Sequence, residues 1–334
     1  MGEAAVTLVA LTHGYVRDFA MGGEVSLHRT LVAAGQPAIV LTRTPEPYDI
    51  DGIRVQQIAT DDVLNVNANP APIVAQLRTL GATMVMAQNE LSLPAVKAAR
   101  ILGIPSIVSV HTPPKYGRGI AQAVAAADHR IYNTYASSVE WGQPGLVLHP
   151  PISPLPPRVT SPKGDAYTLL SNLANKGVTV VLDLAARMPE QRFIIVRSPA
   201  ETTHGIPDFD ARTAGLPNVE VMPRVTPDLV ADRYLTQTRI LLAPSRMETY
   251  AMAPIEAAGH GMPTVCIMNA HVAEGIGEAA YPIGPLDVEG THRGILHIES
   301  RYTDYSHLAR KRAEWIDARQ TMELKAWAEF LATL

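Results

Sequence analysis

The sequence has a single cysteine and no long apolar run. Because Cys266 is alone, an internal disulfide is excluded, and its apolar neighbours predict a buried strand residue rather than a reactive thiol. No apolar stretch approaches the roughly 18 to 20 residues that a helix needs to cross a bilayer. The first residues also lack the basic region of a secretory signal. We therefore expect a cytoplasmic protein without a transmembrane segment.

Charged residues are scarce, and several catalytic motifs are missing. Only 18% of the residues are charged, and the net charge of -4 gives no field that would draw the protein onto duplex DNA or an anionic membrane. The sequence contains no G-x-S-x-G nucleophile motif and no Walker lysine loop. Its 11 histidines show no metal-ligand spacing, and no D-x-D pair precedes a strand. We therefore predict no metal cofactor.

What the sequence does contain is a repeated pattern of strands and helices. A chain of 334 residues is long enough for two domains, each with its own core. In both halves, runs rich in Val, Ile and Leu, such as "PAIVLT" and "RFIIV", alternate with helical stretches, which predicts parallel strands covered by helices. The halves meet where six prolines occur between Pro150 and Pro162, since proline continues neither a helix nor a central strand.

The predicted fold is therefore α/β, with two Rossmann-like, doubly wound parallel-sheet domains that face a cleft. We place the domains at residues 1–150 and 151–305, followed by a C-terminal helix over 306–334 that packs back across them. The polar face of this helix carries both charge signs, which favours packing on its own protein over binding a membrane surface. Ligands collect at the carboxyl ends of the strands in such folds.

The stretch over residues 243–265, "APSRMETYAMAPIEAAGHGMPTV", carries the main candidates for chemistry. A buried strand ends at "APS", Glu248 lies on the following loop, and Glu256 falls in the first turns of a helix. The free N–H groups of residues 249–253 would point at a bound group, and helix N-termini favour phosphate. Hydroxyl-binding carboxylates beside a phosphate-binding helix start suit a nucleotide sugar. The alternative is that Glu256 only complements the helix dipole and Glu248 is solvated.

The same stretch resembles the retaining glycosyltransferases of the GT-B architecture, specifically glycosyltransferase family 4, or group 1. The signature of that family is E-x7-E, followed by EA-x-x-x-G-x-P, and here it runs from Glu248 through Glu256 to Pro263. Further segments resemble the family in the same order: "MGGEVSLH" its glycine-rich loop, "PSIVSVHTPP" the strand before its histidine, and "NLANKGVTVV" its lysine-bearing loop. Several weak motifs in the correct order are more specific than any one of them.

The resemblance implies a metal-independent retaining hexosyltransferase-like enzyme and assigns roles to its residues. The first domain would bind the acceptor and the second the nucleotide sugar, with the ribose hydroxyls on Glu256 and the donor sugar on Glu248. Lys176 would neutralise the diphosphate, whose charge grows in the transition state, and His111 would approach the donor sugar. The remaining donor-binding candidates are Gly22, Gly23, Asn172, Arg224, Thr249, Tyr250, Ala251 and Met252. Alternatively, the lysine is solvated, the Gly-Gly pair is a flexible loop, and the histidine is a hydrogen-bonded loop residue.

Two departures from the family pattern keep other functions open. Asn172 stands where relatives carry an arginine, so one phosphate-binding charge is missing unless Arg246, Arg197 or Arg224 replaces it. The usual G-F-G-L is "TYAM" here, and Ala251 would be strained if that backbone needs a positive φ. One alternative is a non-catalytic nucleotide-sugar-binding relative. A less favoured one is a sugar-nucleotide epimerase.

The substrates are only partly defined. We expect no cofactor, and a UDP- or GDP-linked sugar as the donor. The acceptor is a hydroxyl on a small molecule, a glycan or a modified nucleobase, although the net charge does not indicate a nucleic acid. Tyr15, Arg17, Tyr116 and Arg118 lie on loops of the first domain and suit a sugar or a base that stacks on an aromatic ring.

Overall fold

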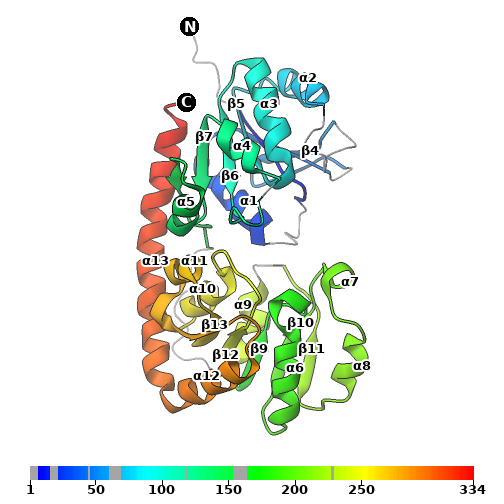
Figure 1. Cartoon of the computed structure of the whole chain (residues 1–334), viewed down its shortest axis with the longest axis vertical. Helices are drawn as coiled ribbons and strands as arrows, with labels where there is room; N and C mark the ends of the chain where they lie inside the picture. Colours follow the sequence, from blue (N-terminus) through cyan, green and yellow to red (C-terminus); the bar gives the residue numbers. More distant parts are fainter. Residues whose placement is uncertain are drawn as a thin grey trace. The chain divides into compact units, whose positions relative to one another are not determined.

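The computed structural model describes residues 7–15, 22–43, 46–59, 69–117, 119–152, 164–226 and 229–334. Most of the proline-rich segment lies outside these residues, as do Arg17 and Arg118. The chain forms two compact units: Met1–Pro151 together with Gln320–Leu334, and Ile152–Arg319. Each unit is built on one mainly parallel sheet with helices on both faces (Figure 1). The predicted pair of parallel-sheet α/β domains is confirmed.

The sheet of the first unit has the strand order β3-β4-β2-β1-β5-β6-β7-β8. Its strands are β1 (Leu8–Leu11), β2 (Ala38–Thr42), β3 (Tyr48–Ile50), β4 (Ile53–Gln57), β5 (Met84–Gln88), β6 (Ser106–Val110), β7 (His129–Tyr132) and β8 (Leu146–Val147). Only β3 and β4 pair in antiparallel fashion among these strands. The chain order reverses between β1 and β5, which makes the carboxyl ends of these strands the topological switch point of this sheet.

Helices cover both faces of the first sheet because its central strands are apolar on both sides. Alternate residues of a strand point to opposite faces, so Leu8 and Ala10 join one core while Val9 and Leu11 join the other. The first core lies under α1 (Gly22–Ala34), and the second lies under α2 (Ala71–Thr79) and α3 (Ser92–Leu102). The remaining helices of this unit are η1 (Asn89–Leu91), α4 (Ala121–Ala126) and α5 (Tyr135–Trp141).

The sheet of the second unit is parallel throughout, with the order β11-β10-β9-β12-β13-β14. Its strands are β9 (Ala166–Leu169), β10 (Phe193–Val196), β11 (Val219–Met222), β12 (Thr238–Ala243), β13 (Thr264–Ile267) and β14 (Ala280–Ile283). Its helices are η2 (Ala174–Lys176), α6 (Val178–Arg187), α7 (Glu201–His204), α8 (Phe209–Ala214), α9 (Val230–Arg233), η4 (Leu235–Gln237), α10 (Met252–Gly259), α11 (Ala270–Gly275), η5 (Gly277–Ala279) and α12 (Val288–Ser300). The order reverses between β9 and β12, so the loops after these two strands meet at the switch point.

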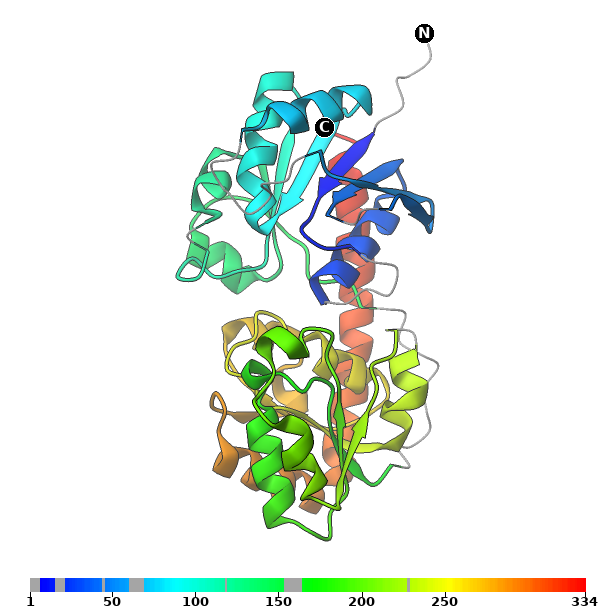
Figure 2. The same cartoon turned by 90° about the vertical axis from the view of Figure 1, so that its right-hand side faces the viewer.

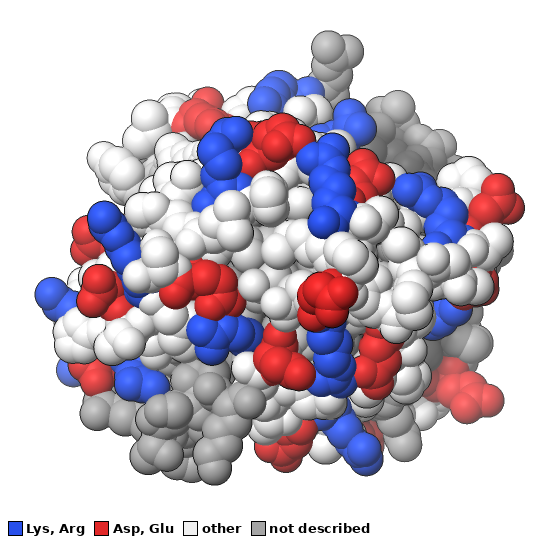
Figure 3. Space-filling view, turned by 90° about the horizontal axis from the view of Figure 1, so that it is seen from below, with Lys and Arg blue, Asp and Glu red and all other residues white. Residues whose placement is uncertain are grey.

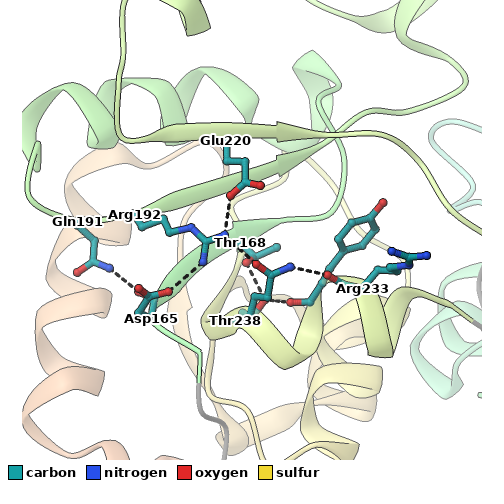
Figure 4. Close-up of polar contacts among 9 residues, drawn as sticks. Asp165, Thr168, Gln191, Arg192, Glu220, Arg233 and Thr238 are labelled. Carbon is teal, nitrogen blue, oxygen red and sulfur yellow. Dashed lines mark hydrogen bonds and ion pairs between the residues drawn. The ribbon is translucent and has the colours of Figure 1, made fainter.

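An arginine ties the strands of the second sheet together at their amino ends (Figure 4). Arg192, directly before β10, donates hydrogen bonds to Asp165 Oδ1 at 3.1 Å, Glu220 Oε2 at 2.5 Å and Gln237 Oε1 at 2.8 Å. Asp165 precedes β9, Gln237 precedes β12, and Glu220 lies in β11. A single guanidinium therefore links four neighbouring strands at the edge opposite to the switch point.

The long helix α13 (Tyr302–Leu331) contributes to both units and is one continuous helix (Figures 1 and 2). Its last part belongs to the first unit, where Glu323 Oε2 accepts a hydrogen bond from the backbone N–H of His149 at 3.1 Å. The indole N–H of Trp327, which is completely buried, donates to the carbonyl oxygen of Thr30 in α1 at 3.0 Å. The helix starts at Tyr302, before the residue 306 expected from the sequence. No helix in the described part of the chain combines the length and the apolar character needed to cross a membrane.

Candidate functional site

The loops that follow β9 and β12 bring together the lysine and the first glutamate singled out in the sequence. Lys176 Nζ donates a hydrogen bond to Glu248 Oε1 at 2.6 Å, and the hydroxyl of Ser245 donates to the same oxygen at 2.8 Å. The Glu248 side chain is 15% exposed and that of Lys176 is 36% exposed. The pair is therefore sheltered but reachable from solvent, at the edge where ligands of doubly wound sheets bind.

A glycine holds the lysine loop against the strand end. Gly177 has φ +87°, and a Cβ atom built on it would lie 2.5 Å from the carbonyl oxygen of Pro244. Only glycine combines this conformation with such a close approach to the backbone. The backbone N–H of Arg246 also donates to the carbonyl oxygen of Asn175 at 2.8 Å, which joins the two loops directly.

Residues 248–252, here called the donor loop, have a strained backbone at one position. Ala251 has φ 62° and ψ 70°, which is the left-handed region. Strain was expected at Ala251 from the sequence if its φ were positive, and φ is indeed positive. An alanine in this conformation costs about 1–2 kcal/mol relative to an unstrained residue. The helix α10 begins at the next residue, Met252, and Ala251 provides no side-chain cap for it. The side chain of Ala251 therefore offers no acceptor to the first N–H groups of α10, and Glu256 lies partly buried within this helix.

Hydrogen bonds from residues outside the donor loop also hold it in place. The side-chain amide of Asn269 donates to the carbonyl oxygen of Glu248 at 3.0 Å, while its Oδ1 accepts from the N–H of Val272 and caps α11. The ring of Tyr250 is buried, and its hydroxyl oxygen accepts a hydrogen bond from Arg319 in α13 at 2.5 Å. The sequence argument missed Ser245, Asn269 and Arg319. Ser245 lies inside the quoted motif, whereas nothing in the local pattern indicates an arginine 69 residues away from Tyr250.

Asn172, which replaces the family arginine, is completely buried and has a structural partner. Its Oδ1 accepts from the backbone N–H of Ser198 at 2.8 Å, and its Nδ2 has no hydrogen-bond partner among the residues described. Of the arginines considered as substitutes, Arg197 forms ion pairs with Glu201 and Asp210. Arg246 is exposed and Arg224 is partly buried in the segment after β11. Asn172 therefore supplies an amide donor without a charge.

The other predicted residues lie in the first unit. His111 directly follows β6, and its Nε2 is 2.9 Å from the hydroxyl oxygen of Ser109. Burial lowers the pKa of His111 to about 4, so the imidazole is neutral at physiological pH. A small cavity borders this ring, with polar lining from Ser26, Thr30, Ser109 and Asn133.

Four further candidates lie in the first unit, two glycines and two tyrosines. Gly22 begins α1, and a Cβ atom on Gly23 would meet nothing within 4 Å. Packing in this structure therefore gives no reason for a glycine at position 23. Tyr15, suggested as an acceptor-facing ring, is instead completely buried, and its hydroxyl lies 2.5 Å from His28 Nδ1. Tyr116 is 58% exposed.

A metal-ligand cluster and the lone cysteine are further candidates for a reactive centre. Among the residues that the structure describes, no group of three or more His, Cys, Asp or Glu side chains is arranged to hold a metal ion. Cys266 is completely buried in β13, where burial raises the pKa of its thiol. The thiol is therefore protonated at physiological pH and is not a nucleophile.

The fold is that of GT-B glycosyltransferases, as solved structures show. HepE of Anabaena in complex with UDP-glucose is 16% identical over 98% of this chain and 100% of that chain, with a TM-score of 0.77. Sucrose-phosphate synthase from Thermosynechococcus elongatus is 14% identical, covers 98% of both chains and has a TM-score of 0.73. WaaG, a glycosyltransferase involved in lipopolysaccharide biosynthesis, is 16% identical over 97% of this chain and 99% of that chain, with a TM-score of 0.69.

The sequence itself identifies the class of the second unit. Residues 166–300 match the family of glycosyl transferases group 1, a segment that runs from β9 to the end of α12 and includes Lys176, Glu248 and Glu256. The resemblance to the group 1 glycosyltransferases is thereby confirmed. No curated protein matches the sequence.

Proposed function

We propose that this protein is a retaining, metal-independent glycosyltransferase of family 4 type. It transfers a sugar from a nucleoside diphosphate sugar, UDP- or GDP-linked, to a hydroxyl of an acceptor. The observation that carries the proposal is the 2.6 Å contact between Lys176 and Glu248 at the switch point of the second sheet, beside the uncapped start of α10. The shared fold of HepE, which was solved in complex with UDP-glucose, supports a nucleotide-sugar donor.

The charges of the site suit a departing nucleotide. The ammonium of Lys176 and the N–H groups at the start of α10 would stabilise the negative charge that develops on the diphosphate as the glycosidic bond breaks. Glu248 would accept hydrogen bonds from hydroxyls of the donor sugar, and Glu256 from the ribose. The carboxylate of Glu248 forms an ion pair with the Lys176 ammonium, which holds that ammonium beside the start of α10.

The configuration at C1 of the sugar would be retained because the acceptor attacks from the same face that the phosphate leaves. The bond from C1 to the phosphate oxygen breaks as the bond from C1 to the acceptor oxygen forms, and the departing phosphate takes the proton of the acceptor hydroxyl. Most of the rate then comes from positioning and charge stabilisation rather than from a covalent intermediate. A neutral His111 would contribute a hydrogen bond to the donor sugar, not a charge.

The first domain would bind the acceptor. The net charge of -4 favours a small molecule or a glycan over a nucleic acid. The face of the molecule in Figure 3 mixes Lys and Arg with Asp and Glu. The only cysteine of the chain is buried and reduced, which suits a cytoplasmic location. We accordingly place the activity in the cytoplasm.

Substitution of the central pair tests the function. In Lys176→Ala and Glu248→Gln, transfer from a nucleotide sugar should fall at least 100-fold, as on loss of a group that stabilises transition-state charge, at about 10² to 10³ per group. Stability should change little, because the lysine side chain is 36% exposed. Lys325→Ala is the matched control, since that side chain is 78% exposed in α13, and it should keep full activity.

The outcomes separate the competing functions. Full transfer by either substituted protein would refute the assignment. Binding of UDP or GDP by calorimetry without any turnover would indicate the non-catalytic relative, which the neutral Asn172 favours. Release of an epimerised sugar without an acceptor would indicate the epimerase.

A further inference from the structure

Arg319 in α13 is fixed on several sides. Its NH2 group donates to the hydroxyl oxygen of Tyr250 at 2.5 Å, and its NH1 group donates to the carbonyl oxygen of Glu274 at 2.8 Å. The guanidinium also lies over the ring of Trp315, 4.6 Å from its centroid. A planar group held by the bond to Glu274 and by a stacked ring is pre-organised, so its contact with Tyr250 costs little additional ordering.

Tyr250 is packed tightly between α13 and α11. Its side chain is 3% exposed, and a Cβ atom on Gly275 would lie 3.1 Å from its carbonyl oxygen. The same atom would be 2.7 Å from Cδ1 of Ile255, so this position leaves little space for movement. Both the ring and the backbone of Tyr250 are therefore constrained by residues outside the donor loop.

The next residue is the strained Ala251, with φ 62°. An alanine stays in the left-handed region only where the surrounding structure holds it there. The position has two neighbours, the anchored Tyr250 on one side and the first residue of α10 on the other. The anchor on Tyr250 therefore contributes to keeping the peptide planes of residues 250–252 in place, together with the bond from Asn269 to the carbonyl oxygen of Glu248.

We propose that Arg319 is a positioning residue of the donor site. By holding the Tyr250 ring, it keeps Ala251 in the left-handed conformation and orients the N–H groups of residues 250–252 toward the diphosphate and the sugar. This inference rests on the proposed function. Without the anchor, Ala251 relaxes to a common backbone conformation, the peptide planes rotate, and the donor binds more weakly.

Two single substitutions and one control test the inference by calorimetry with UDP and GDP. Arg319→Met keeps the apolar stem but removes both donors, and Tyr250→Phe keeps the ring but removes the acceptor. Each should weaken binding of the preferred nucleotide and raise the donor KM about 5- to 10-fold, which corresponds to the loss of one typical hydrogen bond, with a smaller change in kcat.

Arg312→Met is the matched control on the same helix. Arg312 donates to carbonyl oxygens of α11, at Gly275 (2.5 Å), Glu274 (2.8 Å) and Ala273 (3.1 Å), and no hydrogen bond from it to Tyr250 is seen in the described part of the chain. Its substitution should lower the melting temperature while nucleotide affinity stays unchanged. A purely structural role of Arg319 would give this same result for Arg319→Met.

A double substitution gives the decisive comparison. Glycine occupies the left-handed region without strain, so in the Ala251→Gly background Arg319→Met should weaken UDP or GDP binding no more than about 2-fold. An equal loss in both backgrounds, or unchanged affinity in Arg319→Met and Tyr250→Phe, would overturn the inference. If the wild-type protein binds no nucleotide or nucleotide sugar, the proposed function fails as well, and these two failures are readily told apart.

Discussion

At the scale of single residues, the chemistry of the site depends on what surrounds each side chain. The sequence predicted Glu248, Glu256 and Lys176 as site residues, because short motifs occur along the chain in the same order as in the family. The strain at Ala251 was also predictable, since the backbone requirement follows from the residue type that the family motif uses. The burial of Tyr15 and the hydrogen bond between Asn172 and Ser198 were not predictable. Both depend on contacts with residues that are distant in sequence.

The neutral state of His111 has a measurable consequence for stability. Its folded pKa of about 4 lies below the unfolded value of about 6.5, so the unfolded chain binds more protons between these two pH values. This contribution to the free energy of unfolding is therefore complete above about pH 6.5 and is lost as the pH falls toward 4. We expect the urea midpoint to fall over this window in the wild type and to fall less in His111→Gln.

The control for this pH effect is His204→Gln, since His204 is exposed in α7. It should reproduce the pH dependence of the wild type. Equal pH dependence in His111→Gln and the wild type would contradict the assignment of a partly buried, neutral His111.

At the scale of elements, the sequence predicted the alternation of strands and helices, because apolar residues recur with the periods that are typical of each. It also predicted the carboxyl ends of the strands as the place where ligands collect, since doubly wound sheets bind them there. The periodicity does not reveal the polar contacts between elements. Arg192 links four strands through side chains that are distant in sequence, and Arg319 reaches the donor loop from α13.

Gly177 provides a test at this scale, because it joins the lysine loop to the end of β12. Gly177→Ala should lower the free energy of unfolding by about 2–4 kcal/mol, since the added Cβ meets both a positive φ and the carbonyl oxygen of Pro244. The same substitution should weaken nucleotide binding by displacing Lys176. Urea unfolding followed by fluorescence measures the first effect, and calorimetry measures the second.

Gly215→Ala is the companion measurement. This glycine ends α8 with φ -80°, and the nearest atom to an added Cβ, the carbonyl oxygen of Arg212, is 3.6 Å away. It should change stability by about 0.5 kcal/mol or less. Wild-type stability in Gly177→Ala would show that the loop can move away from Pro244 without cost.

At the scale of the whole molecule, α13 makes the first unit discontinuous in sequence. The helix begins in the second unit and ends in the first, so residues far apart in sequence complete one core. The amphipathic pattern of this segment predicted a helix that packs on its own protein. It did not identify Trp327 as the residue that reaches α1, because several apolar side chains share that face of the helix.

Loss of Trp327 should therefore destabilise the first unit. Trp327→Ala removes a completely buried indole and its hydrogen bond to Thr30, and we expect a loss of about 3–5 kcal/mol in the free energy of unfolding. Met322→Ala, at a position that is 65% exposed, should have almost no effect. Thermal unfolding by circular dichroism compares the two, and equal midpoints would mean that α13 does not complete this core.

The position of α13 at the end of the sequence also sets the order in which the two units can finish folding during synthesis. The sheet that begins at Leu8 buries one of its faces partly against Trp327 and Leu331. As the ribosome works from the first residue to the last, that face is covered only in part, by α1, until residues 320–334 have emerged, while residues 152–319 already contain a complete second sheet. The earliest strand to be translated is thus among the last to be sealed, and a nascent chain stalled before Trp327 would expose apolar surface to chaperones.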